Sequence, residues 1–135
     1  MINRQDIRHN ARVLALTNLF CFMFAEEEEL YSTILYKEEV GNIDYDLDFY
    51  HVLYNGVKEN LEEIDYQIEK FAPEWPIKNI GKIDLIILRI AIFEILFEKS
   101  KEQSIVVDEA VELAKEFGND NSSKFIHGVL GAVTA

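Results

Sequence analysis

The segment from Ile83 to Glu98, IDLIILRIAIFEILFE, constrains the fold more than any other part of the sequence. Twelve of its sixteen residues are apolar, and neither Gly nor Pro interrupts them. The segment carries four charges and is shorter than the run of about 18 apolar residues that spans a membrane. A helix that is apolar nearly all round belongs in the centre of a bundle. We therefore predict a central helix over this segment.

The charged residues of this helix predict how it is buried. At about 100° per residue, Asp84, Glu94 and Glu98 fall on one side of the helix, and Arg89 falls on roughly the opposite side among Ile, Leu and Phe. An unpaired buried guanidinium is strongly destabilising. We therefore predict that Arg89 is largely buried and bonded to a carboxylate or to carbonyl groups at a helix end.

The rest of the chain also shows helical patterns and no strand pattern, so we predict an all-α fold. Apolar stripes at helical spacing cover residues 4–24, 46–71, 105–117 and about 123–135, and an acidic run at 26–29 begins a helix that fades near Val40. Gly118 is predicted to end the helix before it. The segment 72–76, APEWP, divides an N-terminal half, 1–72, from a C-terminal half, 73–135. Within this segment, Trp75 is predicted to be buried in the core where the two halves meet, as a core plug.

Charge is distributed unevenly along the chain. The net charge is −12, and the single Cys21 excludes an internal disulfide and a cysteine-based metal cluster. Residues 25–72 hold fourteen acidic residues against three lysines, whereas residues 1–24 have a balance of +2. The first helix carries Arg4, Arg8 and Arg12 in one row, where like charges repel unless an anion faces them. We interpret this row as a binding surface on an otherwise acidic chain. The single cysteine fits a protein of the reducing cytoplasm.

Motifs for catalysis, cofactors or metals are absent from the sequence. His9, His51 and His127 lie far apart without metal-ligand spacing, and no glycine-rich phosphate loop, nucleophile elbow or HExxH occurs. We therefore predict a binding protein rather than an enzyme, with no cofactor and no metal.

Three motifs in the second half resemble the NusB family of transcription antitermination factors. They are IDLIILRIAIFEI, VVDEAVELAKEFG and SSKFIHGVL, and the N-terminal RHNARVLALTNLF is similar to the opening of that family in its spacing. The resemblance covers the whole chain and is weakest from Glu26 to Pro76.

This resemblance implies a fold and a function. The fold would be two packed three-helix bundles with about seven helices. The function would be to bind the boxA element of ribosomal RNA transcripts, as single-stranded RNA, together with NusE. NusE is a ribosomal small-subunit protein, and the pair would act in the RNA polymerase antitermination complex.

The resemblance also implies which residues bind. Its RNA-binding residues would come from two distant stretches, the first helix and the start of the last one. They are Arg8, His9, Asn10, Arg12, Asn121, Ser122, Lys124 and Phe125. The residues implied at the NusE interface are Phe20 and Asp84. Arginines hold phosphates, and an aromatic side chain can stack on an unpaired base.

Departures from the family pattern leave two alternatives open. His9 and Asn10 stand where the family usually has arginine, Asp108 and His127 stand in place of Asn, and the middle third is unusually acidic. We therefore expect weak RNA binding without the partner. One alternative is a helical protein-interaction module that has lost RNA binding. The other is the RNA-binding domain that this fold provides in some ribosomal RNA methyltransferases.

Overall fold

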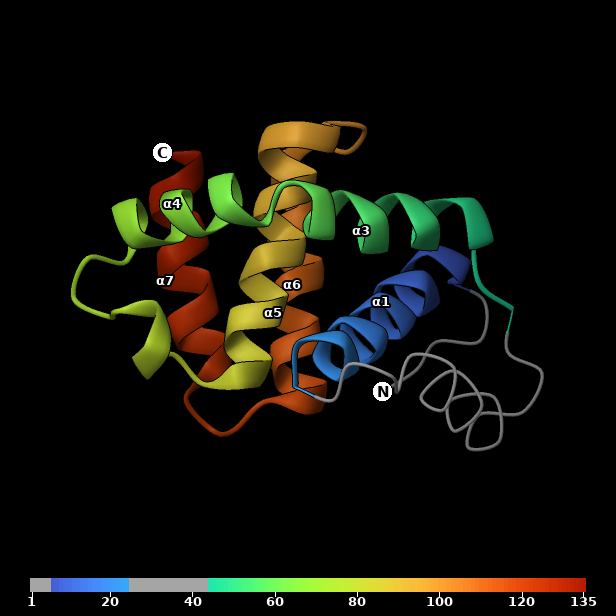
Figure 1. Ribbon diagram of the computed structural model, residues 1–135. Helices are drawn as coiled ribbons and strands as arrows, with labels where there is room; N and C mark the ends of the chain where they lie inside the picture. Colours follow the sequence, from blue (N-terminus) through green and yellow to red (C-terminus); the bar gives the residue numbers. More distant parts are fainter. Residues whose placement is uncertain (1–5, 25–43) are drawn as a thin grey trace. The chain divides into compact units, whose positions relative to one another are not determined.

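The computed structural model describes residues 6–24 and 44–135, and the regular structure in these ranges is entirely helical (Figure 1). The described α-helices are α1 (Ile7–Phe24), α3 (Leu47–Glu59), α4 (Leu61–Phe71), α5 (Lys82–Ile92), α6 (Gln103–Phe117) and α7 (Ser122–Thr134). A 3-10 turn, Ile77–Asn79, precedes α5, and a π-helical stretch, Phe93–Glu98, continues it. The all-α prediction is confirmed for these residues. Arg4 and the helix predicted from Glu26 to about Val40 lie outside the described residues.

The described chain divides into two compact units, Met1–Gly56 and Val57–Ala135. The sequence placed the division at residue 72, but α4 packs against α5 and α7 and therefore belongs to the second unit. The helix predicted over 46–71 is also two helices, because the chain turns at Asn60 between α3 and α4. Asparagine competes with helical backbone bonding and favours such a turn.

In the first unit, an aspartate caps the start of α1 and another caps the start of α3. Buried polar and aromatic contacts join the two helices. The His9 backbone N–H donates to Asp6 Oδ1 at 2.9 Å, and the Phe49 N–H donates to Asp46 Oδ1 at 3.0 Å, so each carboxylate caps a first turn. Asn18 Nδ2 donates to the Tyr50 hydroxyl at 2.7 Å in a buried setting.

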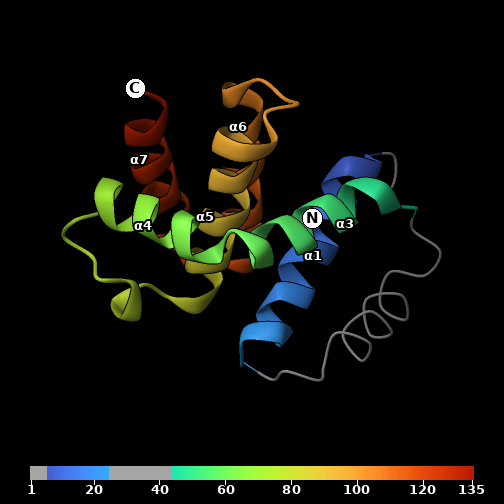
Figure 2. The same ribbon diagram turned by 45° about the horizontal axis from the view of Figure 1, so that its top comes forward.

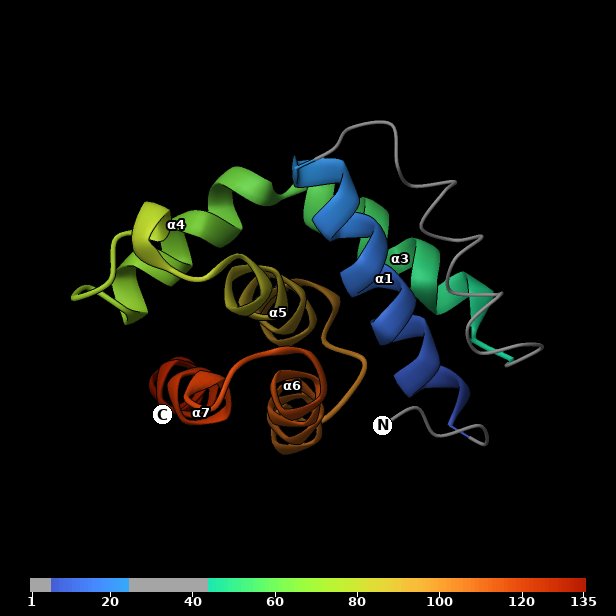
Figure 3. The same cartoon turned by 90° about the horizontal axis from the view of Figure 1, so that it is seen from below.

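In the second unit, α5, α6 and α7 are seen end-on in Figure 3, and α4 lies across α5 and α7 (Figure 1, Figure 2). Aliphatic side chains from all four helices fill the space between them. The largest fully buried ones are Ile64, Ile68, Ile86, Ile87, Leu88, Ile90, Ile92 and Leu113, and α7 adds Ile126 and Leu130. The predicted central helix is thus confirmed, with π turns over its last six residues.

Arg89 is paired as the sequence predicted. It is 8% exposed, and its Nε and Nη2 donate to Asp65 Oδ1 and Oδ2, each at 2.8 Å. This bidentate geometry joins α5 to α4 with charge-assisted bonds.

Glu94 differs from its predicted place on the polar side of the central helix, because it is only 1% exposed. It lies at the start of the π-helical stretch, and both of its chain neighbours, Phe93 and Ile95, are also buried there. The apolar neighbours that enclose the helix therefore also enclose this carboxyl group.

Gly118 ends α6, as predicted, although its φ of −90° is not left-handed. Glycine is required there by space instead, because a Cβ would overlap the Ser122 side chain and lie 2.7 Å from the Ala114 carbonyl oxygen.

We expect Gly118→Ala to lower the free energy of unfolding by about 1–2 kcal/mol, since the added methyl forces the α6–α7 connection apart. The matched control is Gly131→Ala in α7, where a Cβ has open space. Because alanine favours helix over glycine by about 1 kcal/mol, the control is expected to be neutral or stabilising. Urea unfolding of both variants checks this, and equal effects would contradict the packing argument.

Candidate nucleic-acid interface

The N-terminal part of the predicted interface lies on α1, where Arg8 is its partly exposed member. The Arg8 guanidinium carbon lies 4.1 Å from the centroid of the Phe49 ring, and its Nε lies 3.8 Å from Asp46 Oδ2. Both partners come from the beginning of α3, so they hold the side chain in one orientation. Its Nη1 has no hydrogen-bond partner within residues 6–24 and 44–135.

His9, Asn10 and Arg12 are buried, which differs from the RNA-contacting surface that the sequence predicted. Arg12 is 3% exposed, with its guanidinium carbon 5.0 Å from the centroid of Phe49. Asn10 Nδ2 donates to the carbonyl oxygen of Asp44 at 2.8 Å. Asn10 and Arg12 therefore attach the segment that leads into α3, and Phe49 near its start, to the side of α1. Arg12 thus shares the Phe49 ring with Arg8.

The C-terminal part of the predicted interface is the first turn of α7 and the loop before it. Asn121 and Lys124 are exposed, and Phe125 is half-buried. Ser122 is buried, and its Oγ accepts a hydrogen bond from the Asn119 N–H at 2.9 Å. Ser122 therefore shapes the loop, and the neighbouring side chains are the ones that a ligand can reach.

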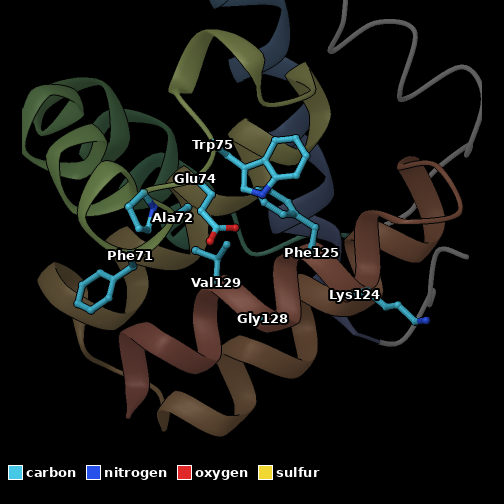
Figure 4. A pocket seen from close by; sticks show the side chains of 9 residues that line it. Phe71, Ala72, Glu74, Trp75, Lys124, Phe125, Gly128 and Val129 are labelled. Carbon is cyan, nitrogen blue, oxygen red and sulfur yellow. The ribbon is translucent and has the colours of Figure 1, made fainter.

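Trp75 belongs to this surface, although the sequence predicted it to be a core plug. It is 51% exposed, and its ring meets Phe125 edge to face with centroids 5.9 Å apart. Figure 4 shows the two rings beside each other, with the Lys124 side chain reaching outward from the start of α7. The sequence signal for this exposure is the position of Trp75 between Pro73 and Pro76, because prolines disfavour helix and place the residue in a loop.

Two hollows flank the pair formed by Trp75 and Phe125. The hollow in Figure 4 has a volume of about 310 Å³ and is lined mainly by the end of α4, the loop 72–75 and α7. The other, of about 340 Å³, also has Trp75 and Phe125 in its wall. Its remaining lining residues are Asn79, Ile80, Gly81, Asp84, Asn119 and Asn121.

The residues predicted at the partner interface lie in different units. Phe20 is half-buried on α1. Asp84 is half-buried in the first turn of α5, where the helix dipole also favours a carboxylate.

The described helices contain none that is long and apolar enough to cross a membrane. Within the same residues, no three His, Cys, Asp or Glu side chains are grouped so as to hold a metal ion.

Comparisons with known proteins identify the family. The chain is 38% identical over 128 residues to the transcription antitermination protein NusB of Clostridium novyi, covering 92% of this chain and 95% of that protein. Identity to the protein of the same name from Ligilactobacillus salivarius is 42% over 127 residues, covering 91% and 94%.

Solved structures show the same likeness. NusB of T. maritima superposes with a TM-score of 0.75 at 32% identity, covering 98% of this chain and 90% of that one. A structure of the antitermination factors NusB and NusE in complex with dsRNA gives a TM-score of 0.75 at 30% identity, covering 93% of each chain. The family model of NusB matches residues 9–135. The chain therefore belongs to the NusB family.

Proposed function

We propose that this chain is a transcription antitermination factor that binds boxA-type RNA of ribosomal RNA transcripts together with NusE, in the RNA polymerase antitermination complex. The observation that carries the proposal is its family membership, together with its likeness to a solved NusB–NusE complex that holds RNA. The protein would work in the cytoplasm by binding rather than by catalysis, which agrees with the antitermination names of its relatives.

The exposed and partly exposed residues of the two parts support this function in different ways. Arg8 and Lys124 supply positive charge for phosphates, while Asn121 and Phe125 supply an amide and an aromatic ring for bases. His9, Asn10, Arg12 and Ser122 contribute by holding these residues in place. Because few cations remain exposed among the predicted residues, RNA affinity without NusE is expected to be low.

We expect Arg8→Ala to reduce the slope of log affinity against log salt by about one charge equivalent, because one phosphate contact is lost. Lys101→Ala is the matched control, since it removes the same charge from an exposed position outside the predicted site. Filter binding to boxA-like RNA at several salt concentrations measures both slopes. Equal slopes for the two variants would show that Arg8 acts only through net charge.

We expect Asp84→Lys to weaken NusE binding in the absence of RNA while changing the melting temperature by only a few degrees. Such a loss would show that Asp84 contacts the partner in addition to stabilising α5 through the helix dipole, an interaction that contributes about 0.3–1 kcal/mol. Calorimetric titration with NusE measures this, and Asp84→Asn separates loss of charge from reversal. Unchanged affinity in both variants would leave only the dipole interaction.

The second candidate function is a protein-interaction module without RNA binding, which the net charge of −12 and the burial of Arg12 favour. A pull-down that offers NusE and boxA-like RNA separately and together distinguishes the two functions. Single-stranded and double-stranded forms of the RNA are both needed, because the similar solved complex holds dsRNA. Capture of NusE alone, with no RNA retained in low salt under any condition, would establish the protein-only module.

A further inference from the structure

We infer that the hollow between Trp75 and the α6–α7 loop binds one unpaired nucleobase of the RNA, with the base stacked on the Trp75 ring. This inference rests on the proposed function and adds to it a base-binding site whose main residue is Trp75. The hollow has a volume of about 340 Å³, at the small end of the range for sites that enclose small ligands.

The stacking surface comes from the arrangement of the two aromatic rings. Trp75 and Phe125 meet with an interplanar angle of 74°, so they do not cover each other's faces as a parallel stack would. Trp75 is 51% exposed, although its ring is the largest apolar side chain available to the protein core. An exposed indole held by a neighbouring ring is a platform on which any base can stack.

The polar wall of the hollow suits the edge of a base. Asn79, Asn119 and Asn121 line it, and each side-chain amide offers both a donor and an acceptor. The Asn119 Oδ1 accepts from the Asn121 N–H at 2.9 Å, which fixes the loop. Within the described residues, the side-chain amides of Asn79 and Asn121 have no protein partner and are available to a ligand. Asp84 adds an acceptor for the amino group of a base.

Charge determines which ligand fits. The hollow contains a carboxylate and no cationic side chain, so a phosphate is disfavoured inside it and a neutral base is not. Lys124 lies outside it, next to Phe125 in the sequence, and α7 has no acidic residue in its first turn. Lysine and the positive end of the helix dipole therefore favour a phosphate beside the hollow. Because Asp84 also attracts cations, a basic side chain of a protein partner is the competing occupant, and titration with NusE alone distinguishes it from a base.

The inference can be tested directly because Trp75 is the only tryptophan of the chain. In low salt, the full chain is titrated with single-stranded boxA-like RNA, first alone and then with NusE bound, while tryptophan emission is followed. We expect the RNA to quench this emission. The same RNA is then prepared as a series in which one nucleotide at a time is abasic, so that every phosphate is kept. One position, or two adjacent ones, is expected to abolish quenching and weaken binding about 5- to 150-fold, which corresponds to about 1–3 kcal/mol per stacked base.

Variants separate stacking from structure. Trp75→Ala is expected to weaken RNA binding by the same factor and to bind the critical abasic RNA as well as the intact one, with the salt slope unchanged. Trp75→Phe should restore most of the affinity, because it keeps an aromatic face. Tyr66→Ala is the matched control, since Tyr66 is 61% exposed on α4 and lines neither hollow beside Trp75. Circular dichroism melting of each variant confirms that it is folded.

Other results would overturn the inference in distinguishable ways. Salt-dependent RNA binding with unchanged tryptophan emission and no critical abasic position would overturn it and leave the proposed function intact. Quenching by NusE alone, with none by RNA, would assign Trp75 to a protein contact. No RNA binding at low salt, even with NusE present, would overturn the proposed function and this inference together.

Discussion

Arg89→Leu is expected to lower the free energy of unfolding by about 2–4 kcal/mol, because it leaves the carboxylate of Asp65 without its bidentate partner. Breaking a fully buried ion pair costs about 3–5 kcal/mol. The expected value is smaller here because the Asp65 side chain retains 24% exposure and part of its hydration. A leucine side chain also cannot form the hydrogen bonds by which Arg89 joins α5 to α4. Urea unfolding at neutral pH measures the change.

A double-mutant cycle separates the pair from the packing around it. Asp65→Leu alone should be destabilising because it leaves a guanidinium in a mostly buried position, whereas the double variant should recover part of the loss. Arg89→Lys is the control that keeps the charge but not the fork geometry, and it is expected to lie between the native protein and Arg89→Leu. Additive effects of the two leucine substitutions would show that the contact contributes nothing of its own.

The central helix and its ion pair could be predicted from sequence because their cause is local. A run of apolar residues without Gly or Pro must be enclosed, and an arginine within it must find a carboxylate. The identity of that carboxylate, Asp65, could not be predicted, since it lies 24 residues earlier on α4 and many acidic residues compete for the role. Periodicity indicates which residues face inward but does not say which helices meet.

The candidate site was predicted less completely because charge and aromaticity do not determine exposure. The row of Arg8 and Arg12 was predicted to be a surface, yet both guanidinium groups lie over the Phe49 ring and Arg12 is buried. Trp75 looked like core, yet the two prolines beside it hold it in a loop where half of its surface stays exposed. In both cases the deciding partner, Phe49 or Phe125, comes from a segment distant in the sequence.

Phe125→Ala is expected to lower RNA affinity by about 1–3 kcal/mol with little change in salt slope. Phe125 is half-buried and meets Trp75 edge to face, so we expect it to affect RNA binding both as a stacking ring and as a support for the Trp75 ring. Loss of a stacking surface removes a term that does not depend on counterions, in contrast to the change expected for Arg8→Ala. Phe125→Ala should therefore lower the RNA affinity at every salt concentration, whereas Arg8→Ala should change the salt dependence of the affinity.

Phe125→Leu separates packing from stacking, because it keeps an apolar side chain between Trp75 and the body of α7 but has no aromatic face. If Phe125 only fills space, Phe125→Leu should bind RNA like the native protein while Phe125→Ala is weakened in proportion to its lost stability. If stacking is its role, both variants should lose affinity, and the free energy of unfolding should fall more for alanine than for leucine. Filter binding at two salt concentrations, with urea unfolding of the same preparations, decides between packing and stacking.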